Sequence, residues 1–107
     1  MHISFIMTTF AHVYNKQFKH YTIMIKENLI EKIKSLVPND TQLEISHNDV
    51  FVHNGTKYLL WEVMNDNNVL WVNYETNTTN GTAYSVLSDF DTEIVQHILD
   101  AVQTNIQ

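Results

Sequence analysis

The side chains that could bind a metal ion are three near neighbours in the middle of the chain and two later glutamates. His47, Asp49 and His53 lie close together, and imidazole and carboxylate groups are common zinc ligands. The strand register that the turns imply places Asp49 and His53 on one sheet face with Glu62 and Glu75. The spacing matches no established metal motif, and such residues are common in turns. A small-ligand or metal-binding domain therefore stays an alternative, and we expect no bound metal or cofactor.

Catalytic chemistry has few candidate residues. Glu44, Glu62 and Glu75 could pair as general acid and base. The chain has no cysteine nucleophile, and its two glycines, Gly55 and Gly81, stand in polar segments rather than in a phosphate-binding loop. Carboxylates on a sheet face commonly serve solubility, so we expect that the protein is not an enzyme.

Charge is distributed unevenly along the chain. Residues 1–34 carry five lysines against two glutamates, whereas residues 35–107 carry Lys57 alone against ten carboxylates. No arginine is present, and arginine is the preferred residue for bidentate phosphate contacts. Direct nucleic-acid binding is therefore not expected. An acidic surface attracts basic partners, although acidity also serves solubility alone.

Length and composition indicate one domain over residues 1–107, with residues 1–23 as an N-terminal extension. The absence of cysteine fits a reducing compartment. No run approaches the ~18 apolar residues of a membrane span. Residues 1–14 lack the positive start of a signal peptide. We therefore expect a cytoplasmic protein without membrane contacts.

Hydrophobic periodicity predicts an α+β fold. Apolar residues recur at helical spacing over 25–36, and Pro38 ends that helix. A meander of four to five antiparallel strands follows, over residues 42–46, 50–53, 56–64, 69–75 and 82–87. A last helix begins near Ser88, with Asp91 as part of a capping pattern. We expect the N-terminal and C-terminal helices to pack on one face of the sheet.

Three turns fix the expected strand register. We expect two-residue turns at His47-Asn48 and Asn54-Gly55 and a four-residue loop over 65–68. Residues paired across a hairpin point to the same face. The predicted core face then carries Leu43, Ile45, Val50, Val52, Leu59, Trp61, Val63, Leu70, Val72 and Tyr74.

The opposite face is expected to mix aromatic and acidic side chains. Its members with the chemistry of a partner-binding patch are Glu44, Phe51, His53, Tyr58, Glu62, Trp71 and Glu75. Aromatic anchors with a charged rim are common at protein interfaces. Two alternatives stay open for this face: residues 1–23 fold over it, or the chain forms a homodimer through it.

The combined features favour a small acidic protein-binding module. Carboxylates on a rigid sheet can imitate a phosphate array and occlude the basic surface of a partner, including a nucleic-acid-binding surface. Nuclease inhibitors, immunity proteins and phage-encoded anti-defence proteins of the anti-CRISPR type act broadly in this way. A structural protein that self-associates through the aromatic face is the alternative.

Overall fold

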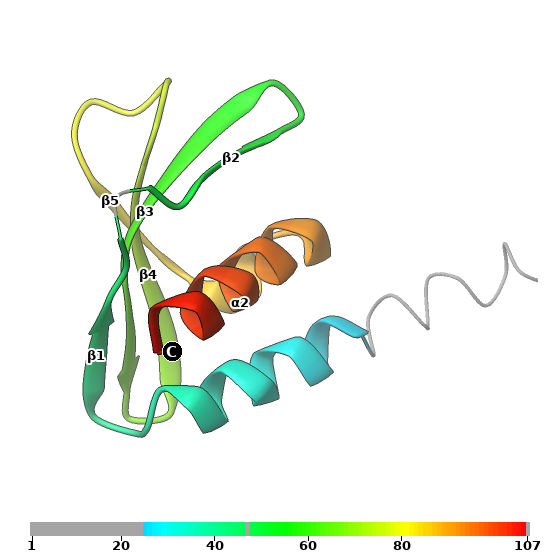
Figure 1. Cartoon of the computed structure of the whole chain (residues 1–107), viewed down its shortest axis with the longest axis vertical. Helices are drawn as coiled ribbons and strands as arrows, with labels where there is room; N and C mark the ends of the chain where they lie inside the picture. The colour runs from blue at the N-terminus through cyan, green and yellow to red at the C-terminus, as the bar shows by residue number, and fades with distance from the viewer. Residues whose placement is uncertain (1–24, 47, 107) are drawn as a thin grey trace, which may run out of the picture.

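Two helices lie on one face of an antiparallel sheet in the computed structural model, which describes residues 25–46 and 48–106 (Figure 1). After the helix over 25–36, the elements are β1 (Thr41–Glu44), β2 (Val50–His53), β3 (Thr56–Asp66), β4 (Val69–Thr76), β5 (Ala83–Val86), the 3-10 turn η1 (Leu87–Asp89) and α2 (Thr92–Ile106). The predicted α+β class is confirmed. Within the described residues, no helix has the length and apolar character needed to cross a membrane.

The helix over 25–36 forms where the apolar spacing predicts it. Ile33 and Val37 are buried in the core, and Leu29 packs against it from the same helix face. The backbone N–H of Val37 still donates to the Ile33 carbonyl at 2.9 Å, and Pro38 follows directly. The proline ends the helix because it disfavours helical geometry in the residue before it.

The strands β1 and β2 lie end to end along the same edge of β3. Leu43 of β1 pairs with Val63, whereas Val50 of β2 pairs with Leu59. The predicted two-residue turn that pairs Ile45 with Val50 is therefore wrong. The 11 residues of β3 can pair with both 4-residue strands, so β1 and β2 need not pair with each other.

Two tight turns join β2 to β3 and β3 to β4. Asn54-Gly55 connects β2 to β3 as predicted, with φ values of 50° and 81° that suit a type I′ turn. The β3–β4 connection is also a two-residue turn, Asn67-Asn68, rather than the expected four-residue loop. Val63 consequently pairs with Val72 instead of Leu70. A shift of two residues does not by itself change the face, so Val63, Leu70 and Val72 keep their predicted place in the core.

A β-bulge at Trp61 changes the faces along β3. Leu60 pairs with Tyr74 and Glu62 pairs with Asn73, so Trp61 is the extra residue. A bulge of this kind interrupts the two-residue alternation of a strand. Leu60 and Val63 are both buried in the core, although they are three residues apart on the strand.

The core lies between the sheet and the two helices. Of the residues predicted to line it, Ile45, Val63, Leu70 and Val72 are buried, and Leu43 and Tyr74 pack against them. The prediction is wrong for Val50 and Val52, which are 42% and 64% exposed. They pair with residues of β3 that come before the bulge, so they lie on the face opposite the helices. Leu59 lies on that same face, since it pairs with Val50.

The C-terminal helix begins later than predicted. Residues Leu87–Asp89 form the 3-10 turn η1, and α2 begins at Thr92, with the N–H of Val95 donating to the Asp91 carbonyl. The side of α2 that carries Ile94, Ile98, Ala101 and Val102 is buried in the core, and so is Phe90 just before the helix.

Candidate functional site

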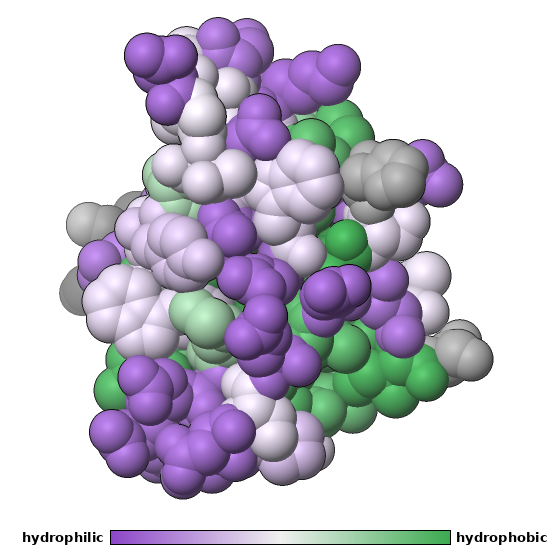
Figure 2. All heavy atoms as spheres, turned by 90° about the vertical axis from the view of Figure 1, so that its left-hand side faces the viewer, coloured by the Kyte–Doolittle hydropathy of each residue, from purple (hydrophilic) through white to green (hydrophobic). Residues whose placement is uncertain are grey.

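The sheet face opposite the helices, here called the outer face, carries acidic and aromatic side chains. Among the described residues no helix covers it (Figure 1). Strand pairing places Glu44 opposite Glu62, Glu62 opposite Asn73, and Trp71 opposite Met64. Viewed from this side, hydrophilic side chains interleave with side chains of intermediate hydropathy (Figure 2). The outer face is the candidate functional site.

Glu62 is the centre of a hydrogen-bond network on this face. Its Oε1 accepts from Gln42 Nε2 at 2.6 Å, and its Oε2 accepts from Asn73 Nδ2 at 3.3 Å and Tyr84 Oη at 3.2 Å. The donors come from β1, β4 and β5, so the carboxylate joins strands across the sheet. The hydrogen bond to Glu62 raises the pKa of Tyr84, because the phenol donates while it keeps its proton.

Trp61 and Glu75 form a second side-chain contact on this face. Trp61 Nε1 donates to Glu75 Oε2 at 2.7 Å, which orients both the indole and the carboxylate. A hollow of about 500 Å³ on this face has Glu44, Trp61 and Glu62 in its lining. The Asn73 Oδ1 is buried and has no hydrogen-bond partner among the described residues. The charged side chains of this face, Glu44, Glu62 and Glu75, are hydrogen-bond acceptors and suit N–H donors.

Three of the seven predicted partner-binding residues do not lie on the outer face. Phe51 stacks on His97 of α2, with ring centroids 4.4 Å apart, and on Tyr58 at 5.0 Å. Phe51 and Tyr58 therefore belong to the helix side of the sheet. Burial raises the pKa of Tyr58, and the charges of Tyr74 and Asp91 act in the same direction. The expectation that these two rings share a face with Trp71 is wrong because it omits the bulge at Trp61.

His53 also lies on the helix side, where it binds the start of α2. Its Nε2 is 3.2 Å from Asp91 Oδ2, and its Nδ1 is 3.2 Å from Glu93 Oε1. The side chain is only 12% exposed. These contacts attach the tip of the β2–β3 hairpin to the helix, a structural role that the sequence did not indicate.

The residues of the metal-binding alternative are not brought together. His53 contacts α2, whereas Glu62 lies on the outer face and Asp49 accepts a hydrogen bond from Asn105 Nδ2 at 2.8 Å. In the described part of the chain, no group of three histidine or acidic side chains could hold a metal ion. His47 and the predicted extension over residues 1–23 lie outside the described residues.

Four side chains of the outer face were not predicted to act there. Gln42, Asn73 and Tyr84 hold Glu62, and Trp61 holds Glu75. Tyr84 is 52% exposed, which makes it an accessible aromatic group beside the carboxylates. Alternation in the fifth strand could have placed Tyr84, but Trp61 was assigned to the core because alternation alone does not reveal a bulge.

Comparison of this chain with family models, curated proteins and solved structures finds no match.

Proposed function

We propose that this protein is a binding module whose outer face docks on a basic surface of a partner protein. The observation that carries the proposal is the Glu62 network, in which side chains from β1, β4 and β5 hold one carboxylate on a face otherwise rich in aromatic groups. Occlusion of a basic groove, as in stoichiometric inhibitors of nucleic-acid-binding proteins, is the mode of action that this chemistry favours.

The anatomy of the outer face supports this proposal. Trp61 and Trp71 are half-buried, Tyr84 is exposed, and the carboxylates of Glu44 and Glu62 stand beside them. Tryptophan and tyrosine are enriched among the residues that contribute most to binding energy at interfaces. The aromatic groups would supply contact area, and the carboxylates would select a partner with lysine or arginine side chains.

Preorganisation is the second support. Glu62 accepts three side-chain hydrogen bonds, and Glu75 accepts one from Trp61. A side chain that is already ordered loses less conformational entropy when a partner arrives, and an immobilised rotamer-rich side chain otherwise costs about 0.5–1.5 kcal/mol. The two carboxylates are thus presented at fixed positions before binding.

The charge balance favours a basic partner over an acidic one. Lys57 is the only lysine after residue 34 in a chain without arginine, and it pairs with Val52 at the hairpin end of β3. Long-range attraction would increase the association rate with a basic surface and would decrease as salt is added. The same field would repel the phosphate backbone of a nucleic acid.

Affinity capture from the native host, with the folded protein as bait, tests this proposal. We expect a basic protein to be retained by the wild type at low salt and lost at about 1 M salt, where the Debye length falls to roughly 3 Å. A bait with Glu44, Glu62 and Glu75 all changed to glutamine should retain much less of it.

The matched control bait carries the same number of neutralised carboxylates away from the outer face. Its three substitutions are Glu27→Gln and Glu31→Gln on the helix over 25–36 and Asp89→Asn in η1. Equal loss of the partner from both triple variants would contradict the proposal, because it would show a dependence on total charge rather than on this face. Circular dichroism on each bait confirms that the fold is kept.

A further inference from the structure

The strand β2 forms a free edge of the sheet (Figure 1). It pairs with β3 on one side, and no other described strand pairs with it on the other side. Natural sheets commonly protect such an edge with a lysine, a proline or a bulge. The sequence of β2, Val-Phe-Val-His, has no lysine or proline, and its pairing with β3 is regular. The edge of β2 is therefore open to a further strand.

The backbone of Val52 points away from β3. Val52 lies opposite Lys57, and both backbone groups of Lys57 bind Asn77 on the far side of β3. The Lys57 N–H donates to Asn77 Oδ1 at 3.2 Å, and the Lys57 carbonyl accepts from the Asn77 N–H at 3.1 Å. Val52 and Lys57 are thus a non-hydrogen-bonded pair, in which the N–H and carbonyl of each residue point outward. The backbone groups of Val52 therefore lie at the free edge, without a partner among the described residues.

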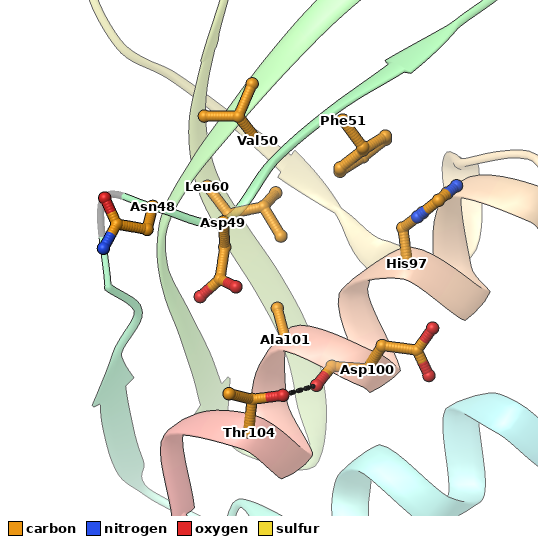
Figure 3. A pocket seen from close by; sticks show the side chains of 9 residues that line it. All are labelled: Asn48, Asp49, Val50, Phe51, Leu60, His97, Asp100, Ala101 and Thr104. Atoms are coloured by element: carbon orange, nitrogen blue, oxygen red, sulfur yellow. Dashed lines mark hydrogen bonds between the residues drawn. The ribbon is translucent and has the colours of Figure 1, made fainter.

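The side chain of Val52 is exposed as well. At 64%, Val52 is the most exposed of the large hydrophobic residues in the described chain. Phe51, the preceding residue, points to the other side of β2 and stands beside His97 of α2 (Figure 3). This stack holds β2 in position, so the strand loses little freedom when another strand pairs with it. An exposed apolar side chain and two unpaired backbone groups thus coincide at one residue.

We infer that β2 pairs antiparallel with β2 of a second copy of this chain, with the twofold axis at Val52. Each Val52 N–H then donates to the carbonyl of the other Val52, and the two valine side chains meet on one face of the joined sheet. An axis at Phe51 is excluded, because the alternation of the strand turns the backbone groups of Phe51 towards β3.

This register makes the edge complementary to itself. Phe51 comes opposite His53 of the second copy, and Val50 comes opposite Asn54. No carboxylate faces another carboxylate, an arrangement that would be destabilising. The free edge of β1, by contrast, carries Glu44. A second copy supplies the matching strand without any further partner, and its pairing does not depend on the function proposed for the outer face.

The dimer should be weak and should become stronger as salt is added. A pair of 4-residue strands buries far less than the roughly 1,600 Å² of a standard stable interface. Each copy has a net charge of -6, so two copies repel each other, and salt screens that repulsion. The expected salt dependence is opposite to that of a basic partner on the outer face.

The test is sedimentation equilibrium of the full chain over a dilution series, with amide hydrogen exchange followed by NMR. We expect a reversible dimer with a dissociation constant on the order of 0.1–1 mM. The constant should be at least about threefold smaller at about 0.5 M than at about 0.05 M salt. Protection of the Val52 amide should rise with protein concentration. The Lys57 amide should not change, because it is already bonded to Asn77.

Variants locate the contact. Val52→Pro removes the N–H, which a free edge tolerates, and Val52→Lys adds the residue that commonly protects such edges. Each should raise the dissociation constant at least about tenfold. Val69→Lys is the matched control, because it adds the same charge at another exposed valine, and it should not weaken the dimer. Should Val52→Pro fail to fold, Val52→Lys still decides the matter.

Three results would overturn the inference: a monomer at about 1 mM protein at every salt concentration, a dimer that both Val52 variants leave intact, or an equal loss in Val69→Lys. A monomer whose Val52 amide becomes protected only with a captured protein would also overturn it and would assign the edge to that protein's strand. The capture experiment on the outer face is decided separately, because the carboxylates altered there do not belong to β2.

Discussion

Leu60 and Glu62 point to opposite faces of the sheet although a single residue separates them on β3. Leu60 is 1% exposed in the core, whereas the Glu62 carboxylate accepts hydrogen bonds on the outer face. In a regular strand these two residues would share a face. Trp61, the extra residue of the bulge, changes that relation and thereby puts a carboxylate beside the aromatic groups of the outer face.

The Glu62–Tyr84 hydrogen bond should be visible in an alkaline titration. Because Glu62 raises the pKa of Tyr84, this phenol should ionise at higher pH than an ordinary tyrosine near 10. Glu62→Gln should lower the pKa of Tyr84 towards that value, and Glu44→Gln should leave it unchanged. The difference in absorbance at alkaline pH between each variant with Tyr84 and its Tyr84→Phe counterpart measures the effect. Identical curves for Glu62→Gln and wild type would refute it.

Tyr58 should make the stability of the fold depend on pH in the alkaline range. Burial raises its pKa in the folded state, so the folded protein keeps a proton that the unfolded chain releases above about pH 10. The contribution is complete below that pH and is lost as pH rises through the folded-state value. Tyr58→Phe should therefore flatten the decline in unfolding free energy above pH 10. Denaturant titrations at several alkaline pH values measure the unfolding free energy. An equally steep decline in the Tyr58→Phe variant would contradict this prediction.

Asn65 should contribute strongly to stability. It is 2% exposed, and its Nδ2 donates to the Val37 carbonyl at the end of the first helix at 2.8 Å. Asn65→Ala leaves that carbonyl without its partner, so we expect a loss of about 1–3 kcal/mol in unfolding free energy by urea denaturation. Asn28→Ala, at an exposed position on the helix over 25–36, is the control and should change stability by less than about 0.5 kcal/mol.

The elements that could be predicted are those that the local sequence determines. The helix over 25–36 follows from apolar spacing and Pro38, and the Asn54-Gly55 hairpin follows from two residues that tolerate positive φ. Of the predicted binding residues, Glu44, Glu62, Trp71 and Glu75 belong to strands whose pairing places them on the outer face or in contact with Trp61 there.

The incorrect part has causes that lie outside the local pattern. Whether β1 pairs with β2 or with β3 depends on the length of β3, which competes for both strands. The bulge at Trp61 cannot be recognised from the alternation of apolar and polar residues along β3. Because of it, Phe51, His53 and Tyr58 lie on the helix side of the sheet. Tertiary contacts such as the Phe51–His97 stack decide that arrangement.

His53 should hold the β2–β3 hairpin onto α2. It contacts the carboxylates of Asp91 and Glu93, both on the exposed side of the helix start. His53→Ala should therefore increase amide hydrogen exchange over the residues of the hairpin while exchange in the core of α2 changes little. Asn80→Ala, at an exposed position in the loop after β4, serves as the comparison. A uniform increase throughout the protein would show that His53 supports the whole fold instead.

The role of the outer face is tested most directly by the affinity of the captured basic partner for the variant in which Glu44, Glu62 and Glu75 are glutamine. Isothermal calorimetry on purified proteins at fixed ionic strength gives the dissociation constant. We expect binding at least about tenfold weaker than wild type, equivalent to about 1.4 kcal/mol, and little change for the control with Glu27, Glu31 and Asp89 neutralised. Wild-type affinity in the outer-face variant would contradict the proposed binding surface.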